Sequence, residues 1–371
     1  MTPFELPPYP YDLLDRFREL AGNHQGGVID LSVGTPCDPP PAAVVEALSK
    51  SGSERGYPKS IGSTDYLEAC SEWLQRRFGV EIPVDEALAG CIGTKELVAS
   101  TPSDLRLANP EKDTVLFPSI SYPSYAMGAQ LAGCRAVPIP VDSDLKINLE
   151  QVSDDDANRA LMIWINSPCN PTGVLEDLTA VAKWGRDRNI PVFSDECYTE
   201  FTWKGEPQTI LNEGLKGVVA VHSLSKRSNL AGLRAGFFAG DPAIVHWLRE
   251  IRKHGGKMIP GPVQSAAVHA FRDDGHVADQ RALYKERLEF LKLCFRELGF
   301  SVSLPEGTFY LWIHSQERDC WEVVESLAAE VGVLVTPGTF FGKSCENFIR
   351  VAAVQEMSKL TLLKERISKL S

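Results

Sequence analysis

Short apolar runs alternate along this chain with stretches whose apolar residues recur every three or four positions. The runs are typical of buried strands, and the stretches are typical of helices with one buried face. The predicted strands are Val115–Phe117, Ala136–Pro140, Leu161–Asn166, Val192–Ser194 and Val218–Ser223. The predicted helices are residues 40–52, 64–78, Leu97–Leu107, Tyr125–Leu131, Leu178–Arg188 and Ala243–Arg252. This alternation predicts an α/β fold in which helices cover both faces of a mainly parallel sheet.

The pattern changes near residue 275, where the sequence predicts one long charged helix from Gly275 to Leu298. Beyond it we predict a helix at Trp321–Val331 and strands at Ser301–Leu304, Tyr310–Ile313, Gly332–Thr336 and Phe348–Val354. Such a mixture is typical of a smaller α+β unit. We therefore expect a large domain of residues 42–274 and a small domain that combines residues 1–41 with residues 275–371.

Composition and charge narrow the kind of protein. The 371 residues are 43% hydrophobic and carry a formal net charge of −11 without a basic tail, which argues against nucleic acid and anionic membranes as partners. No apolar run reaches the length of a membrane span, and the first residues lack the layout of an export signal, so we expect a cytoplasmic protein. The nine cysteines form no C-x-x-C pair and the seven histidines show no metal-binding spacing, so we expect reduced thiols and no metal site.

Lys226 carries the most informative candidate chemistry. It follows the predicted strand Val218–Ser223 and precedes Arg234 within a segment rich in serine and glycine. A lysine held at the end of a buried strand is desolvated, so its amine can lose a proton and form a Schiff base with a carbonyl group. Hydroxyl groups and an arginine on the same segment suit a phosphate. An aldehyde and a phosphate together describe pyridoxal 5′-phosphate (PLP).

Three neighbouring predicted strands deliver polar residues to one place. The carboxyl ends of parallel strands meet at one edge of a sheet, where ligands bind. Asn170, Asp195 and Tyr198 follow two of these strands, and Lys226 follows the third. Beside a pyridine nitrogen, a buried Asp195 carboxylate would keep that nitrogen protonated. Asn170 and Tyr198 can donate hydrogen bonds to the 3-oxygen of the same ring.

Gly93 opens a turn before the helix at Leu97–Leu107, and such a turn leaves several backbone N–H groups available to an anion. We expect Thr94 to contact a phosphate through its hydroxyl and amide groups, and Lys95 through its amide. Thr94 also suits a plain helix N-cap, which does not exclude phosphate binding.

These motifs resemble, in their order along the chain, those of the class I and II aminotransferases, which are PLP enzymes of fold type I. The motifs include Gly93-Thr-Lys-Glu96, Asn170-Pro-Thr-Gly173, Asp195-Glu-Cys-Tyr198, Ser223-Leu-Ser-Lys226 and Gly232-Leu-Arg-Ala-Gly236. The resemblance implies a large domain with a mainly parallel sheet of seven strands and a smaller α+β domain. It also implies that Lys226 is the catalytic lysine and that the substrates are amino acids and 2-oxo acids.

The resemblance assigns further cofactor contacts. Ser223, Ser225 and Arg234 would complete the phosphate cradle, and Tyr122 would stack on the pyridine ring. Tyr57 matches the family tyrosine that reaches the phosphate in the neighbouring subunit. This match implies a homodimer with shared active sites.

The resemblance also assigns the substrate contacts. Arg350 would bind the substrate α-carboxylate through its planar guanidinium fork, which lysine cannot reproduce. Gly34 would bring its backbone near the same carboxylate, with Asn170 close by. No residue can be assigned to the distal carboxylates; Arg16, Arg55 and Lys257 are candidates by position alone.

Several stretches are similar to one branch of the family, the N-succinyldiaminopimelate aminotransferases. They include Ile92–Ala99, Ser194–Tyr198, His222–Phe237, Arg252–His254 and Pro262–Gln264. The branch implies ping-pong transamination through a Lys226 Schiff base, in lysine biosynthesis. The amino donor would be N-succinyl-LL-2,6-diaminopimelate and the acceptor 2-oxoglutarate.

Other functions remain open from the sequence alone. The same cofactor residues would serve an aspartate, aromatic or kynurenine aminotransferase, and equally a PLP-dependent carbon–sulfur β-lyase. A transcription regulator with an aminotransferase-like domain would need an added DNA-binding domain and a basic surface. Only about 30 residues precede the first core motif of this acidic chain, so we expect an enzyme.

Overall fold

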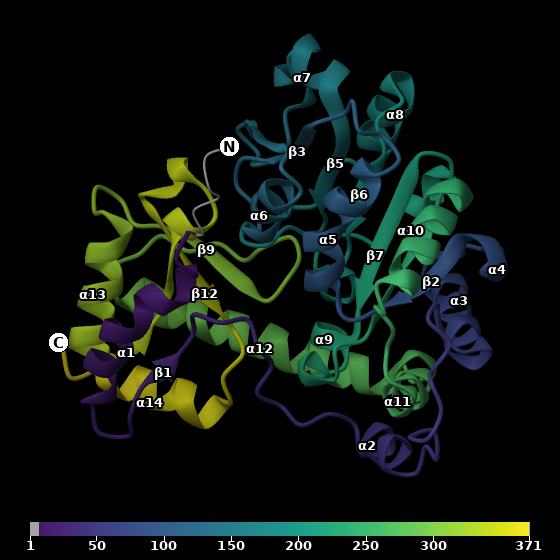
Figure 1. Ribbon diagram of the computed structural model, residues 1–371. Helices are drawn as coiled ribbons and strands as arrows, with labels where there is room; N and C mark the ends of the chain where they lie inside the picture. Colours follow the sequence, from purple (N-terminus) through teal and green to yellow (C-terminus); the bar gives the residue numbers. More distant parts are fainter. Residues whose placement is uncertain (1–6, 371) are drawn as a thin grey trace. The chain divides into compact units, whose positions relative to one another are not determined.

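The computed structural model describes residues 7–370 of the chain, and these form two compact units (Figure 1). The large unit consists of residues 35–283 and 305–308. The small unit consists of the other described residues, 7–34, 284–304 and 309–370. The domain boundaries near residues 42 and 274 stay a prediction. Residues 1–6, on which the expected absence of an export signal depends, lie outside the described residues.

The large unit is built on one sheet of seven strands in the order β2-β8-β7-β6-β5-β3-β4. β8 is antiparallel to both of its neighbours, and the other neighbouring pairs are parallel. The strands are β2 (Leu88–Cys91), β3 (Thr114–Pro118), β4 (Arg135–Ile139), β5 (Ala160–Asn166), β6 (Val192–Asp195), β7 (Val218–Ser223) and β8 (Gly236–Gly240). The predicted α/β fold with a mainly parallel, seven-stranded sheet is therefore confirmed.

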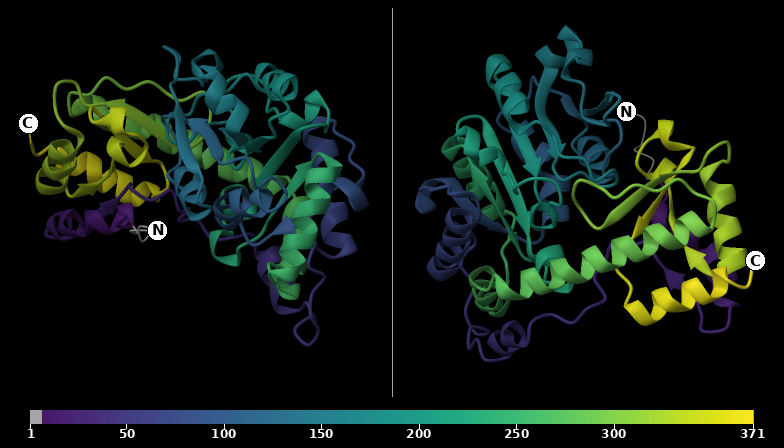
Figure 2. Two further views of the ribbon diagram at one scale, coloured as in Figure 1. Left: turned by 45° about the horizontal axis from the view of Figure 1, so that its top comes forward. Right: turned by 180° about the vertical axis from the view of Figure 1, so that it is seen from behind.

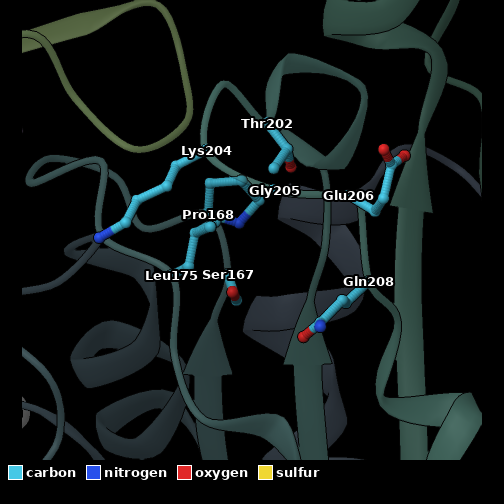
Figure 3. Close-up of a pocket in the computed structure, with 8 residues that line it drawn as sticks. All are labelled: Ser167, Pro168, Leu175, Thr202, Lys204, Gly205, Glu206 and Gln208. Carbon is cyan, nitrogen blue, oxygen red and sulfur yellow. The ribbon is translucent and has the colours of Figure 1, made fainter.

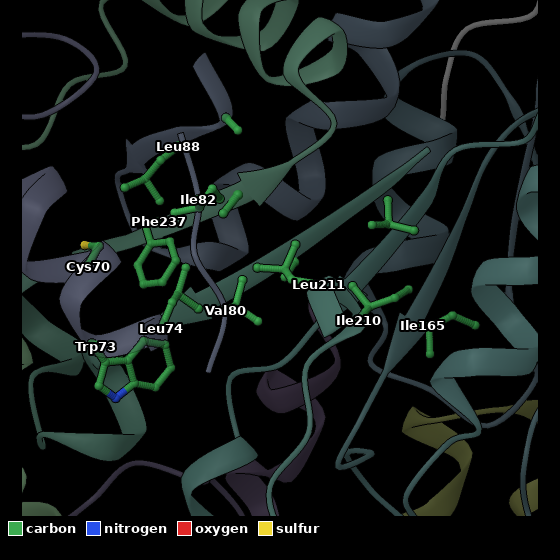
Figure 4. Packing of buried hydrophobic residues seen from close by; sticks show 14 of the residues in the cluster. Cys70, Trp73, Leu74, Val80, Ile82, Leu88, Ile165, Ile210, Leu211 and Phe237 are labelled. Carbon is green, nitrogen blue, oxygen red and sulfur yellow. The ribbon is translucent and has the colours of Figure 1, made fainter. Parts of the chain in front are cut away.

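The central strands β5, β6 and β7 are buried at every residue. Their apolar sequences suit a sheet that is covered on both faces, because none of their positions has to meet water. Successive side chains point to opposite faces, so each strand contributes to two cores. We call the buried cluster around Trp73, Ile165 and Phe237 the Trp73 core (Figure 4), and the one around Tyr125 and Trp164 the Trp164 core.

Helices supply the other half of each core, and Figure 2 shows the large sheet from two further sides. The Trp73 core takes side chains from α3 (Thr64–Phe78), α8 (Leu178–Arg188) and α11 (Gly261–Arg272). The Trp164 core takes them from α5 (Thr94–Arg106), α6 (Ser124–Leu131) and α10 (Pro242–His254). The remaining helices of the unit are α2 (Ala42–Ser49), α4 (Val84–Ala87), α7 (Asp154–Arg159) and α9 (Leu224–Arg227).

β2 and β8 were not among the predicted strands. β8 has glycine at both ends, and glycine weakens the sequence signal of a strand. A Cβ atom at Gly236 would lie only 2.5 Å from the carbonyl oxygen of His222. Glycine therefore allows β8 to pair closely with β7, although the same residue makes the strand harder to recognise from the sequence.

The small unit contains a three-stranded antiparallel sheet, β11-β12-β9, and a parallel pair, β1-β10. Its strands are β1 (Ile29–Asp30), β9 (Tyr310–His314), β10 (Val333–Leu334), β11 (Thr336–Pro337) and β12 (Phe348–Ala352). Its helices are α1 (Asp15–Gly22), α13 (Cys320–Val331), α14 (Met357–Ile367) and the greater part of α12 (Gly275–Glu297). Within residues 7–370, no helix combines the length and the apolar character that crossing a membrane requires.

Two predictions for the small unit were wrong. Ser301–Leu304 forms no strand, because Val302 is its one buried residue and a strand needs a whole face to pack. The predicted strand Gly332–Thr336 is divided into β10 and β11, which belong to different sheets. β10 pairs with β1 and β11 pairs with β12, so the chain changes partners at Val335.

Candidate active site

The carboxyl ends of β5, β6 and β7 form one edge of the large sheet, and several predicted site residues lie at or just after these ends. The three strands are parallel neighbours, and Asn166 at the end of β5 is in register with Asp195 at the end of β6. The expectation that three neighbouring strands end together is therefore confirmed. The segments that follow these strands carry Asn170, Tyr198 and Lys226.

Asp195 is buried and is held by two donors. Its Oδ2 accepts a hydrogen bond from the Tyr125 hydroxyl at 2.9 Å, and its Oδ1 accepts one from the Cys197 amide at 3.3 Å. Burial raises the pKa of Asp195, while the hydrogen bonds from Cys197 and Tyr125 oppose that rise. A protonated ring nitrogen beside the carboxylate would offset the cost of burying its charge. The carboxylate thus fits the pyridine nitrogen of PLP.

The contact of Tyr125 with Asp195 was not predicted from the sequence. The Tyr125 ring is fully buried and stacks on Trp164, with 5.3 Å between the ring centroids and 17° between the planes. The half-buried ring of Tyr122 meets Tyr125 edge-on at 6.0 Å. The sequence indicated Tyr125 only as the second tyrosine of Tyr122-Pro-Ser-Tyr125. Which carboxylate its hydroxyl contacts is seen in the structure alone.

Asn166 also was not predicted as a site residue, although it connects two segments that were. Its Nδ2 donates to the carbonyl oxygen of Asp195 at 2.7 Å, and its Oδ1 accepts from the Asn170 amide at 2.7 Å. A side-chain amide has both donor and acceptor groups, so one buried residue can hold two chain segments together. In the sequence, Asn166 could have been noticed as the polar residue that ends an apolar strand.

The N-terminus of α5 and Arg234 form the candidate phosphate cradle. Gly93 is the N-cap with a φ of 72° and, as a glycine, supplies no side-chain cap, and Thr94 is the first helical residue. A Cβ atom at Gly93 would lie 2.1 Å from Nη2 of Arg234, so the guanidinium group sits directly against the glycine. Backbone amides at a helix start and a guanidinium group together fit a phosphate.

Lys226 lies on α9, the single helical turn that follows β7. The lysine is half-buried, whereas Ser223 and Ser225 beside it are buried. The Ser223 hydroxyl accepts a hydrogen bond from the Ser225 amide at 3.1 Å, and the two hydroxyl oxygens lie 2.9 Å apart. Arg227 is buried on the other side of the turn and pairs with Glu200 at 3.4 Å, which anchors α9 in the protein interior.

Two further cofactor candidates, Tyr198 and Lys95, lie on the segments that follow β6 and β2. Tyr198 is buried just after β6. The thiol group of Cys197 donates to the Thr94 hydroxyl at 3.3 Å, so the segment after Asp195 touches the start of α5. Lys95, the second residue of α5, is exposed.

Two of the three predicted substrate residues, Gly34 and Arg350, lie in the small unit, where they share one aromatic neighbour, whereas Asn170 belongs to the large unit. Arg350 is 1% exposed and donates to the Ser32 carbonyl oxygen at 2.5 Å. Its guanidinium carbon lies 4.2 Å from the centroid of the Tyr310 ring and 4.7 Å from that of the Phe341 ring. A Cβ atom at Gly34 would lie 1.9 Å from the Tyr310 hydroxyl oxygen. Tyr310, which was not predicted, therefore contacts the guanidinium group and also requires glycine at position 34.

A pocket of about 110 Å³ opens beside the loop that carries Asn170. Figure 3 shows its lining residues, Ser167, Pro168, Leu175, Thr202, Lys204, Gly205, Glu206 and Gln208. The Lys204 ammonium group pairs with Glu306 at 2.5 Å, and the Lys204 and Glu206 side chains point away from each other. Charged groups therefore do not converge on this pocket, and we assign it no ligand.

The chain is similar to known aminotransferases over nearly its whole length. A profile of the family described as aminotransferase class I and II matches residues 26–367. The chain is 38% identical to the 4-dedimethylamino-4-oxo-anhydrotetracycline transaminase OxyQ of Streptomyces rimosus, over 98% of this chain and 99% of that protein. It is 33% identical to the LL-diaminopimelate aminotransferase of Aquifex aeolicus, over 98% and 97% of the two chains. The solved structure of a probable N-succinyldiaminopimelate aminotransferase from Thermus thermophilus matches with a TM-score of 0.86 at 27% identity, over 98% of this chain and 100% of that one.

Proposed function

Because the chain belongs to the class I and II aminotransferases, which use PLP to exchange amino groups between amino acids and 2-oxo acids, we propose that its amino donor is N-succinyl-LL-2,6-diaminopimelate. The acceptor in this proposal is 2-oxoglutarate. The observation that carries the choice is that relatives from two independent comparisons bear the names of diaminopimelate aminotransferases. The segment similarities to the succinyl-specific branch favour the succinylated donor over free LL-2,6-diaminopimelate.

PLP, when bound, supplies an aldehyde that condenses with amines and a ring that withdraws electrons from the substrate Cα. We assign the covalent attachment to Lys226, whose Nζ would also carry the proton between the substrate Cα and the C4′ carbon of the cofactor. Asp195 would hold the proton on the ring nitrogen. Asn170 and Tyr198 would donate to the ring 3-oxygen, and Tyr122 would stack on the ring.

The phosphate would be held by the cradle of Gly93, Thr94 and Arg234, together with the Lys95 amide and a serine hydroxyl. The close approach of the guanidinium group to Gly93 supports this assignment, since any larger residue there would displace it. Of the serines, Ser223 caps α9, so its hydroxyl is already oriented toward the Ser225 amide.

Substrate carboxylates need a separate site, and we assign the α-carboxylate to Arg350. Its guanidinium group is buried and fixed between two aromatic rings, which orients a planar fork for two parallel hydrogen bonds. Of the positional candidates for a distal carboxylate, Lys257 pairs with Asp104 at 3.2 Å and Glu96 at 3.7 Å. Its charge is therefore already compensated, which argues against Lys257 as the reader of the distal group.

We also propose a homodimer in which Tyr57 reaches the phosphate bound by the neighbouring subunit. Tyr57 is 100% exposed, which is unusual for a large aromatic side chain. A partner subunit that covers this ring would remove the exposure and place its hydroxyl in a polar site. Light scattering of the purified protein should give twice the mass of one chain.

The donor is tested by single-turnover measurements on purified PLP-loaded enzyme. N-succinyl-LL-2,6-diaminopimelate should react with a kcat/KM at least about tenfold above that of LL-2,6-diaminopimelate, since a missing succinyl contact costs on the order of 1.4 kcal/mol. A preference for the free diamino acid, or for an unrelated donor, would refute the donor and leave the family intact. Release of pyruvate and ammonia from a cystathionine-like compound would indicate a β-lyase instead.

Two variants test the assigned residues in the same assay. Lys226→Ala should lose at least about a thousandfold in turnover, and borohydride should no longer fix PLP to the chain in mass spectra. Arg350→Lys keeps the charge but loses the fork, so it should slow both half-reactions together. If Arg350→Lys used glutamate normally and failed only with the succinylated donor, Arg350 would bind the distal part of that donor rather than its α-carboxylate.

A further inference from the structure

The segment that carries Tyr57 has an exposed middle and two anchored ends. We call residues 53–63, which connect α2 to α3, the Tyr57 loop. Residues 54–57 are exposed, and the loop contains no strand or α-helix. A loop without regular structure holds its shape only through specific contacts, so the contacts at its two ends decide where Tyr57 lies.

The first anchor is a close approach between the start of the loop and the N-terminus of α11. A Cβ atom at Gly261 would lie 2.8 Å from the carbonyl oxygen of Ser53 and 2.9 Å from its hydroxyl oxygen. Only glycine therefore lets α11 touch the backbone of the loop at this point. The contact fixes the chain just before its exposed residues.

The second anchor is Gln264, a buried residue of α11 that is 3% exposed. Its Oε1 accepts a hydrogen bond from the Ser63 amide at 2.6 Å. Its Nε2 donates to the carbonyl oxygen of Ile259 at 2.8 Å and lies 3.4 Å from that of Lys59. Lys59 and Ser63 bracket the turn that ends the Tyr57 loop.

The chemistry of this anchor requires a side-chain amide. One acceptor must meet a backbone N–H group while two donors meet backbone carbonyl oxygens, and the amide of Asn or Gln supplies this combination from one group. Ser63 also caps α3 by accepting the Tyr66 amide at 3.2 Å, so its own backbone position matters for the helix that follows. Gln264 thus connects α11, the loop and the start of α3.

We propose that Gln264 is a positioning residue that sets the Tyr57 loop for PLP binding across the dimer interface. The inference rests on the proposed role of Tyr57 at the phosphate bound by the neighbouring subunit. Gln264 acts on Tyr57 through the backbone of Lys59 and Ser63, which follow Tyr57 in the same loop. Its role is therefore to fix the path of the chain rather than to hold the cofactor or the substrate.

The experiment compares PLP retention in full-length protein of four kinds: wild type, Gln264→Met, Tyr57→Phe and the double variant. Holoenzyme is dialysed against a series of PLP concentrations, and the retained PLP is measured by absorbance after release in alkali. Each single variant should weaken PLP binding on the order of tenfold, since each loses the benefit of one hydrogen bond to a charged phosphate. The double variant should be no weaker than Tyr57→Phe within about twofold.

Ser265→Ala is the matched control, because Ser265 is the next residue of α11 and its hydroxyl donates within the helix, to the Gly261 carbonyl oxygen at 3.4 Å. It should retain PLP as wild type does. Gln264→Glu keeps the acceptor and loses the donors, so it should resemble Gln264→Met.

Additive losses in the double variant would overturn the positioning role, because Gln264 would then act independently of Tyr57. Loss of the dimer in both Gln264 variants would overturn it too, because the residue would then support the dimer rather than position Tyr57. An unchanged PLP affinity in Tyr57→Phe would refute the shared site itself. Normal affinity in Gln264→Met beside a weakened Tyr57→Phe would refute only the role of Gln264.

Discussion

Asp195 and Glu196 are adjacent acids, yet the fold sends them to opposite faces of the large sheet. Asp195 joins the Trp164 core side, where the Tyr125 hydroxyl and the Cys197 amide donate to its carboxylate. Glu196 faces the Trp73 core, where its Oε1 accepts the Ile210 amide at 2.8 Å and its Oε2 lies 3.2 Å from Nε2 of His222. The alternation of side chains at the end of β6 therefore separates a candidate cofactor ligand from a structural acid.

The same alternation acts on β7. His222 lies against Trp73 and Phe237, with ring centroids 4.9 Å and 5.0 Å away, whereas Ser223 belongs to the site edge. Burial raises the pKa of Glu196 to about 7 and lowers the pKa of His222 to about 3. Between about pH 3 and about pH 7 both side chains are therefore neutral in the folded protein. The Glu196–His222 pair is thus neutral on its face of the sheet, whereas on the site face two donors favour a charged Asp195 carboxylate.

The largest expected difference between the two faces is in turnover. Asp195→Asn should lower kcat by at least about a hundredfold, because a neutral amide no longer holds the proton on the ring nitrogen. Glu196→Gln, one residue away, should stay within about threefold of wild type, since it imitates the protonated acid. Steady-state rates of both purified variants decide the matter, and equal losses would remove the functional distinction between the faces.

A second prediction concerns stability against pH. Above about pH 4.5 the unfolded chain loses the Glu196 proton that the folded protein keeps, so this acid lowers stability as pH rises toward 7. Below about pH 6.5 the unfolded chain protonates His222 while the folded protein does not, so the histidine lowers stability as pH falls. In the wild type the two effects cancel between about pH 4.5 and 6.5, because folded and unfolded states each hold one proton on the pair.

Breaking the pair should therefore produce opposite slopes. Glu196→Gln should become more stable as pH rises through this window, and His222→Phe should become less stable, each by at most about 1.4 kcal/mol per pH unit relative to wild type. Urea unfolding at several pH values measures these slopes. Parallel curves for the wild type and both variants would show that the pair is not neutral in the folded protein.

A smaller effect is expected from the donor that supports Asp195. Tyr125→Phe removes the hydroxyl and keeps the ring that stacks on Trp164, so the fold should be preserved. The lost hydrogen bond opposed the raised pKa of Asp195, so that pKa should rise further and the acid limb of the activity profile should move to higher pH. We expect kcat/KM at neutral pH to fall about tenfold. An unmoved acid limb would mean that Tyr125 only packs.

Local sequence alone determined the central strands and the residues that follow them. β3, β5, β6 and β7 are apolar runs whose burial needs no knowledge of their partners, and Lys226, Asp195 and Asn170 stand at or just after the ends of the last three. Motif chemistry could therefore identify these candidates from the amino-acid sequence. The family resemblance added Arg350 and Tyr57, and it assigned Ser223, Ser225 and Arg234 to the phosphate cradle.

Tertiary structure decided the contacts between segments that lie far apart in the chain. Which carboxylate Tyr125 reaches, which two segments Asn166 joins and which loop Gln264 holds all depend on pairing across many residues. β8 could not be recognised from the sequence, because the glycines that allow its close pairing with β7 also shorten the apolar run that would indicate a strand. The wrong prediction of a strand at Ser301–Leu304 also reflects tertiary structure. A strand exists only where another chain segment completes its hydrogen bonds and covers one of its faces.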